Sequence, residues 1–168
     1  MGNAGGIFKI ILFNFYYSLK KIFFLVHIMH GMSYAVSGNV KSFKMKGYPQ
    51  EEPLIPHGVS VILNAPAVVK FTSTANPERH LLAAEALGAD IRGASTAEDA
   101  AEILQNEIIK YMKATDMPNG LKAVGYDEKD IDILVDGTFP QKRVVENCPV
   151  DVTKADLSKI FKNAMKYW

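Results

Sequence analysis

The chain has 168 residues, of which 48% are hydrophobic and 22% charged, so it is long enough and apolar enough to form a folded domain. Its net charge of +1 gives no sign of a basic surface, and we expect no nucleic-acid partner. The single cysteine, Cys148, excludes an internal disulfide and a cysteine-rich zinc site. With no base beside it in sequence, Cys148 is not expected to be a catalytic thiol.

Residues 1–25 form a hydrophobic segment whose only charges are three lysines. Its longest uncharged run, Ile10–Leu19, is ten residues long, about half of what a membrane-spanning helix requires. We therefore expect an extra hydrophobic N-terminal helix here. Contact of residues 6–25 with a membrane surface stays open from the residues alone, although it is not the favoured reading.

The next stretch predicts two helices separated by a loop. Residues 26–37 fit a short helix, and residues 38–56 are rich in glycine and proline and fit a loop with a short strand at most. Residues 57–73 are apolar nearly all round, which is typical of a buried helix. Pro56 fits a position in the first turn, and Pro66 should bend the helix.

The remainder of the chain predicts four helices, each opened by a capping residue. We expect them from Asn76 to Gly88, from the capping box Ser95–Glu98 onward, from Glu128 to about Gly137, and from Thr153 onward. The second of these should bury one face, made of Ala97, Ala100, Ala101, Leu104, Ile108, Tyr111 and Met112. The last should bury Leu157, Ile160, Phe161, Ala164 and Met165. The pattern predicts an all-α domain over residues 26–168.

Two histidines, His30 and His57, are each followed by a glycine and lie in different predicted helices. Neutral imidazole is a good ligand for Fe(II), Zn(II) or Ni(II), and two distant helices can bring such residues together. The spacing is consistent with a metal held between helices, although hydrogen-bonded structural histidines are the more common case. His27, three residues before His30 on the same helix face, is a candidate third ligand or outer-shell partner.

Other polar residues near this pair carry weaker signals. Tyr34 lies on the helix face of His30 and can hydrogen-bond a substrate, although an ordinary half-buried tyrosine fits as well. Glu51 and Glu52 lie in the loop, where an acid near a histidine is common. His80, on an amphipathic helix, is expected to be a surface or packing residue.

Three blocks of sequence carry a resemblance to a known family: Val26–Tyr34 (VHIMHGMSY), Ser37–Val40 (SGNV) and Pro53–Gly58 (PLIPHG). Shorter matches continue it at Pro77–His80, Leu87–Asp90 and Ala123–Tyr126. These blocks resemble the iron-containing alcohol dehydrogenase family, and within it the hydroxyacid–oxoacid transhydrogenase branch. The implied fold is the helical C-terminal domain of the dehydroquinate synthase-like, iron alcohol dehydrogenase type.

The resemblance implies a metal site and a hydride carrier. In the family, one Asp and three His hold Fe(2+) or Zn(2+), and His30 and His57 match the last two of these histidines. The Asp and the first His of the family have no counterpart in this sequence. Tyr34 matches a position near the nicotinamide that is His in many members and Tyr in the transhydrogenase branch. NAD is bound by a separate α/β domain of the family, and no match to that domain is visible here.

The resemblance also implies a function and raises a question about residues 6–25. The transhydrogenase branch converts 4-hydroxybutyrate and 2-oxoglutarate, two small hydroxy and oxo acids, to succinate semialdehyde and 2-hydroxyglutarate in mitochondria. Gly2–Gly5 match the residues that directly precede Val26 in the family, so we interpret residues 6–25 as an insertion or a translated intron. We expect the chain to be a fragment with little activity by itself. The alternative is a non-catalytic helical module or a membrane-associated remnant of the family.

Overall fold

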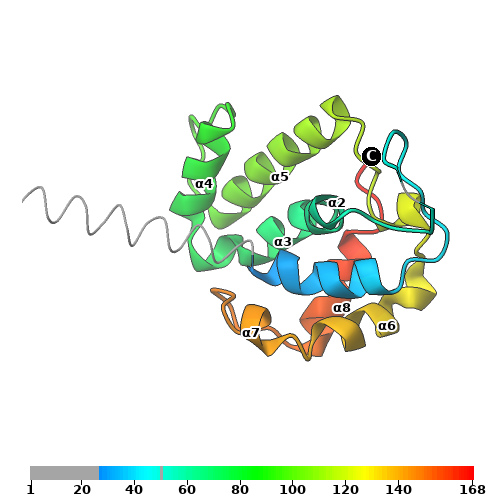
Figure 1. Cartoon of the computed structure of the whole chain (residues 1–168). Helices are drawn as coiled ribbons and strands as arrows, with labels where there is room; N and C mark the ends of the chain where they lie inside the picture. Colours follow the sequence, from blue (N-terminus) through cyan, green and yellow to red (C-terminus); the bar gives the residue numbers. More distant parts are fainter. Residues whose placement is uncertain (1–26, 50) are drawn as a thin grey trace, which may run out of the picture.

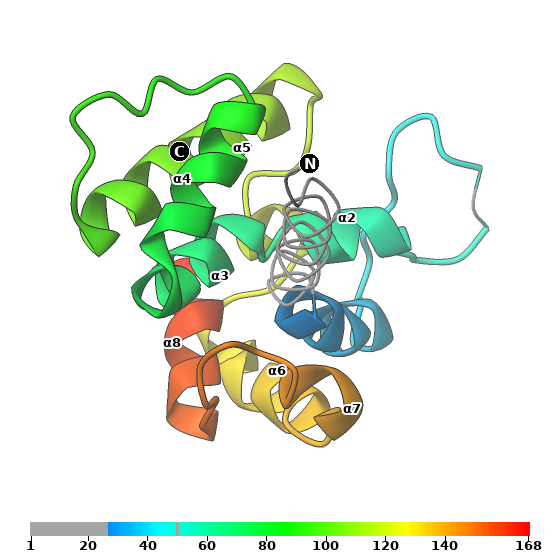
Figure 2. The same cartoon turned by 90° about the vertical axis from the view of Figure 1, so that its left-hand side faces the viewer.

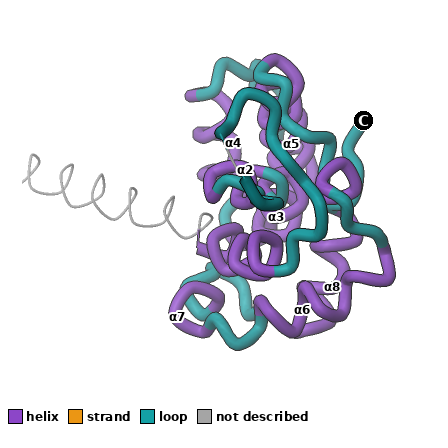
Figure 3. Tube along the Cα trace, turned by 45° about the vertical axis from the view of Figure 1, so that its right-hand side comes forward, coloured by secondary structure: helices purple, strands orange, loops and turns teal. Residues whose placement is uncertain are grey.

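The computed structural model describes residues 27–49 and 51–168, and every regular element in that part of the chain is a helix (Figure 3). The prediction of an all-α domain is therefore confirmed. None of the helices in the described part is both long enough and apolar enough to cross a bilayer. The extra hydrophobic helix expected in residues 1–25 lies outside the described residues.

The described part of the chain is a succession of helices joined by turns and loops. After a helix at residues 27–38 come α2 (His57–Ile62), α3 (Ala65–Thr72), η1 (Ser73–Ala75), α4 (Pro77–Ala86), α5 (Ala97–Ala114), η2 (Leu121–Val124), η3 (Glu128–Asp130), α6 (Ile131–Thr138), α7 (Lys142–Val145) and α8 (Lys154–Asn163). Figures 1 and 2 show the helix of residues 27–38 between α2 on one side and the α6–α7 pair on the other.

The helix of residues 27–38 packs closely against α6 and α7. Its buried apolar residues recur at helical spacing, and they are Ile28, Met32, Ala35 and Val36. A Cβ on Gly31 would lie 3.1 Å from side-chain atoms of Val144 and Val145, and one on Gly137 would lie 3.0 Å from Ala35. The two glycines therefore let α7 and α6 approach the helix at van der Waals distance.

Side-chain caps fix where several helices begin. Asn76 caps α4, and Thr153 with Asp156 forms a capping box on α8, as predicted. On α5 the box pairs Thr96 with Asp99, one residue later than predicted, because the Asp99 carboxylate accepts from the Thr96 backbone N–H at 2.9 Å. In both boxes a short Asp side chain completes the reciprocal pair.

The apolar run of residues 57–73 is two helices instead of one bent helix. α2 ends at Ile62 and α3 begins at Ala65, with Pro66 in the first turn of α3. A proline there needs no backbone N–H partner, so the chain starts a second helix. Pro56 is the residue before α2 and not its first helical residue.

The helices α3, α5, α6 and α8 contribute many of the buried side chains of the core. All five residues expected to face inward from α8 are buried. On α5, Ala100, Ala101, Leu104 and Met112 are buried as predicted, whereas the prediction for Tyr111 was wrong. Tyr111 is 46% exposed because its hydroxyl reaches out to donate to the Leu87 carbonyl oxygen at 2.8 Å.

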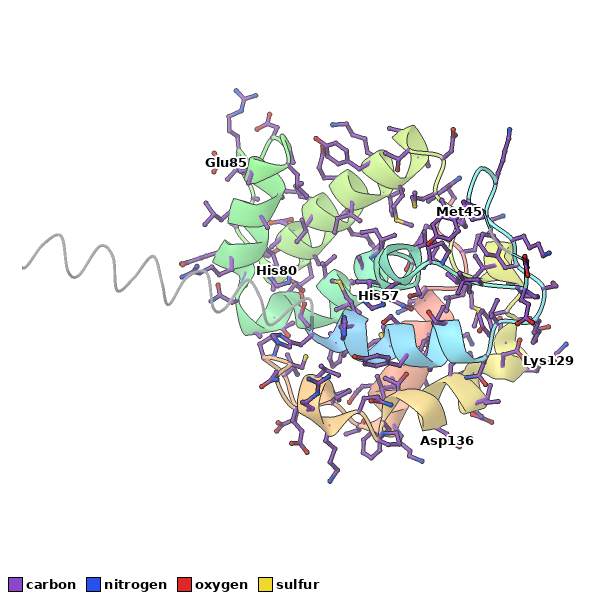
Figure 4. The ribbon with its side chains drawn as sticks, viewed as in Figure 1. Met45, His57, His80, Glu85, Lys129 and Asp136 are labelled. Atoms are coloured by element: carbon purple, nitrogen blue, oxygen red, sulfur yellow. The ribbon has the colours of Figure 1, made fainter. Side chains whose placement is uncertain are left out.

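His80 is a buried packing residue at the junction of α3 and α4 (Figure 4). One ring nitrogen, Nε2, is 3.0 Å from the Thr72 hydroxyl, and the other, Nδ1, is 2.9 Å from the Asn76 carbonyl oxygen. Both polar atoms of the ring are thus satisfied inside the core. Burial lowers the pKa of His80, and hydrogen bonding to Asn76 opposes this effect.

Replacing Leu134 by Ala should lower the free energy of unfolding by about 2–5 kcal/mol, because this side chain of α6 is fully buried and its loss leaves a cavity. The neighbouring Ile133 is 52% exposed, so Ile133→Ala should cost less than about 1 kcal/mol. Urea unfolding followed by circular dichroism measures both values. Equal losses in the two variants would contradict the placement of α6.

Stability should fall as the pH drops below about 6.5, in part through His80. The pKa of His80 is lowered in the folded chain by burial, so below that pH the unfolded chain binds a proton more readily than the folded chain does. His80→Gln removes this titration, and its unfolding free energy should change less between pH 7 and pH 5.5 than that of the unaltered chain. Identical pH dependence in the two proteins would show that His80 is not buried as described.

Candidate metal centre

The helix of residues 27–38 sorts its side chains onto two faces. Ile28 and Met32 point into the core, whereas His30 is only partly buried and Tyr34 is 39% exposed. His30 and Tyr34 are four residues apart, which places them one above the other on the same face. Packing of the apolar face therefore fixes the direction in which His30 and Tyr34 project.

His57 reaches the same place from a different element. It is the first residue of α2, directly after Pro56, and its side chain lies between α2 and the helix of residues 27–38 (Figure 4). The ring centroids of His30 and His57 are 4.8 Å apart, and the rings meet edge to face with an interplanar angle of 79°. The structure thus brings together the two histidines that the sequence singled out.

Tyr34 also belongs to this cluster. Its hydroxyl is 2.8 Å from Nε2 of His30, and the two ring centroids are 5.0 Å apart. This hydrogen bond occupies one of the two ring nitrogens of His30. A metal ion that binds His30 through Nε2 must therefore displace the tyrosine hydroxyl.

The surroundings favour the neutral form of His30. Partial burial lowers the pKa of His30, and charge repulsion from His57, Arg143 and His27 lowers it further. Neutral imidazole is the form that donates a lone pair to a metal ion. His30 is therefore favoured in the form that can bind a metal ion at neutral pH.

The separation of the two rings fits a shared ion. A divalent metal lies about 2.1 Å from an imidazole nitrogen, and hence about 3.2 Å from the ring centre. Two ring centres 4.8 Å apart then subtend about 100° at a common ion, close to the angles in tetrahedral and octahedral sites. The separation of the ring centres is thus compatible with one shared ion of the iron or zinc type.

The rest of a metal site is not found in the part of the chain that the structure describes. Residues 27–49 and 51–168 contain no group of three or more His, Cys, Asp or Glu side chains that could hold an ion. Glu51 and Glu52 are exposed in the loop, and His27 is half-buried on the helix of His30. The described residues therefore give no support to His27 as a third ligand, and its role as an outer-shell partner stays a prediction.

The sequence did not single out Arg143. This residue lies on α7, and its positive charge lowers the pKa of His30. A four-residue helix gives too short a hydrophobic pattern to predict. The sequence feature that could have indicated the position of α7 is Gly31, because a glycine beside His30 allows another element to approach closely there.

Comparison with known proteins identifies the class. Residues 22–165 match the family described as Fe-containing alcohol dehydrogenase, C-terminal. The chain belongs to this family, whose members are enzymes. In fold it is similar to the crystal structure of 1,3-propanediol oxidoreductase, with a TM-score of 0.67 and 24% identity over 82% of this chain and 32% of that one.

Among members of the family, the chain is similar in sequence to hydroxyacid-oxoacid transhydrogenases. The chain is 55% identical over 141 residues to a probable mitochondrial hydroxyacid-oxoacid transhydrogenase of Dictyostelium discoideum, covering 83% of this chain and 26% of the relative. It is 47% identical over 143 residues to the mitochondrial hydroxyacid-oxoacid transhydrogenase of Homo sapiens, covering 85% and 30% respectively. The chain thus spans between a quarter and a third of the length of these relatives, at their C-terminal part.

Titration of the chain with Zn²⁺ at neutral pH should show weak binding that depends on both histidines. His57→Ala and His30→Ala should each weaken it by about tenfold or more, because each removes one of two ligands. Tyr34→Phe should strengthen it by about fivefold, since the ion no longer competes with a hydrogen bond worth about 1 kcal/mol.

Tyr111→Phe is the matched control, because this tyrosine is similarly exposed and lies on α5. It should leave the affinity unchanged. Unchanged Zn²⁺ binding in His57→Ala would exclude the pair as ligands.

Proposed function

We propose that this chain is the helical, metal-binding part of an iron-containing hydroxyacid–oxoacid transhydrogenase. The observation that carries the proposal is the edge-to-face contact of His30 and His57 in a chain about half identical to such enzymes. The reaction would oxidise 4-hydroxybutyrate to succinate semialdehyde and reduce 2-oxoglutarate to 2-hydroxyglutarate. Hydride would pass through bound NAD, so that no net oxidant is consumed.

His30 and His57 would hold Fe(2+), or Zn(2+) in its place. The ion supplies Lewis-acid polarisation of the hydroxyl or carbonyl oxygen of the substrate. The buried face of the helix of residues 27–38 sets the direction of His30, and His57 meets it from the exposed first residue of α2. A ligand whose direction is set by packing would need little reorganisation during the reaction.

Tyr34 would lie beside the substrate and the nicotinamide. Its half-exposed ring is anchored to His30 in the metal-free chain. With His30 bound to a metal ion, the Tyr34 hydroxyl would be free to donate a hydrogen bond to a substrate oxygen. The role proposed for Tyr34 is therefore to orient the substrate at the metal.

Two imidazoles are half of the ligand set that the family uses, and the remaining part of the site would come from sequence outside the matched region. For the isolated chain we propose a non-catalytic helical module. We also propose that residues 26–168 form the metal-binding domain and residues 1–25 an added segment. A mitochondrial location is proposed because the relatives carry that description.

A chimaera tests the proposal. Residues 27–168 are joined to the N-terminal part of the Dictyostelium discoideum relative, and 4-hydroxybutyrate is supplied together with 2-oxoglutarate. The chimaera should form 2-hydroxyglutarate, and His57→Ala in it should lower the rate by about 100-fold or more, since a metal ligand is lost. The isolated chain should show no turnover.

Two results would contradict the proposal. One is turnover by the isolated chain, which would mean that the two-histidine cluster needs no further ligands. The other is a chimaera that folds and binds metal yet transfers no hydride between the two acids.

A further inference from the structure

α2, the helix that carries His57, is short and has an exposed first end. It has six residues, and no side chain caps its N-terminus. His57 is exposed and follows directly after the loop of residues 39–56. At the other end of α2, Leu63 is fully buried, and the chain continues into α3, which is buried along most of its length. The direction of α2 is therefore set mainly at its junction with α3.

A tyrosine hydroxyl from a distant part of the chain lies at this junction. The Tyr167 hydroxyl donates to the Leu63 carbonyl oxygen at 2.8 Å, although the two residues are 104 apart in sequence. Burial raises the pKa of Tyr167, and a hydrogen bond from the backbone of Ala67 opposes this rise. In a continuous helix the Leu63 carbonyl would accept directly from the Ala67 N–H, four residues later. The hydroxyl therefore takes the place of one hydrogen bond of the helical ladder.

Two features that kink helices thus coincide between α2 and α3. Pro66 has no N–H, so it cannot donate to the carbonyl of Ile62. The Tyr167 hydroxyl occupies the next position of the ladder, and a side chain inserted there bends a helix. The proline removes a bond without favouring one bend, whereas the hydroxyl holds two backbone groups at a set separation. The angle between α2 and α3 therefore depends on Tyr167.

A second segment of the chain holds Tyr167 in place. The side-chain oxygen of Asn119 accepts from the backbone N–H groups of Tyr167 and Trp168, at 2.8 and 3.2 Å. The next residue, Gly120, has a positive φ of 69°, and a Cβ there would lie 2.6 Å from the carbonyl oxygen of Ala164. A glycine at this position lets the two segments run side by side. The tyrosine is thus fixed through its backbone and through its hydroxyl.

From these contacts we infer that Tyr167 is a positioning residue for the His30–His57 pair, because its hydroxyl sets the direction of the helix that carries His57. The inference rests on the proposed function, in which the two histidines bind one ion. Six residues of helix are about 9 Å long, so a turn of about 15° at Leu63 would move the first residue of α2 by about 2 Å. The ring centroids are 4.8 Å apart, so a shift of this size would take the rings away from a common ion.

Tyr167→Phe in the 168-residue chain tests the inference with two measurements. Without the hydroxyl, the Leu63 carbonyl can bond directly to the Ala67 N–H, and α2 should turn away from its present direction. The cross-relaxation between the ring protons of His30 and His57 in the metal-free chain should therefore weaken. The affinity for Zn²⁺ should fall by about fivefold or more, as it does when the orientation of a ligand is lost.

Tyr126→Phe is the matched control. The Tyr126 hydroxyl is also buried and donates to a backbone carbonyl, that of Val36, at 2.6 Å, but it lies at no kink of the helix of residues 27–38. Both variants should lower the midpoint of urea unfolding, because each loses one buried hydrogen bond. Tyr126→Phe should nevertheless keep the histidine cross-peak and change the Zn²⁺ affinity by less than about twofold.

Three results would overturn the inference. The first is a Tyr167→Phe chain with unchanged cross-peak and unchanged Zn²⁺ affinity. The second is an equal loss of both in Tyr126→Phe, which would make the effect one of general stability. The third is a loss of affinity in Tyr167→Phe with the cross-peak intact, since Tyr167 would then not act through the placement of His57.

The outcome is separate from that of the proposed function. If the unaltered chain binds no Zn²⁺ at the pair, the metal site fails, and the cross-peak alone decides whether Tyr167 holds the two rings together. If Zn²⁺ binds through His57 with equal affinity in the unaltered chain and in Tyr167→Phe, the metal site stands and the positioning role fails.

Discussion

The close packing of the helix of residues 27–38 between α2 and the α6–α7 pair is the constraint on which the site depends. Ile28, Met32 and Val36 are fully buried in it, and the glycines at positions 31 and 137 allow the neighbouring helices to approach closely. Once that face is buried, the direction of His30 is set, and α2 brings His57 to within contact of it. Two residues far apart in sequence thus meet through hydrophobic burial of the helices that carry them.

Within residues 27–49 and 51–168, the histidine pair has no third metal-binding side chain grouped with it. The histidine pair is held in the metal-free chain by ring contact and by the hydroxyl of Tyr34. That hydrogen bond satisfies an otherwise exposed polar edge and competes with an incoming ion. Partial burial and the neighbouring basic groups lower the pKa of His30 and so favour the neutral imidazole that a metal ion requires.

The sequence predicted local features well and non-local ones poorly. Thr153 and Asp156 were recognisable as a cap because the hydrogen bonds join residues three apart. The pairing of His30 with His57 was identified through a family resemblance, since spacing alone does not reveal which helices cross. Arg143 and α7 escaped prediction because their position depends on packing at Gly31, more than a hundred residues earlier. Tyr111 was misassigned because helical periodicity cannot tell a core face from a hydroxyl that reaches a distant carbonyl.

The contact between the two imidazoles is tested most directly by cross-relaxation between ring protons in the metal-free chain, with His57→Ala used to assign the signals. Rings in edge-to-face contact, with centroids 4.8 Å apart, should give a clear cross-peak between His30 and His57. A second cross-peak should join His30 to Tyr34. A folded chain that shows the tyrosine cross-peak but none between the two histidines would contradict the central claim that helix packing alone brings the pair together.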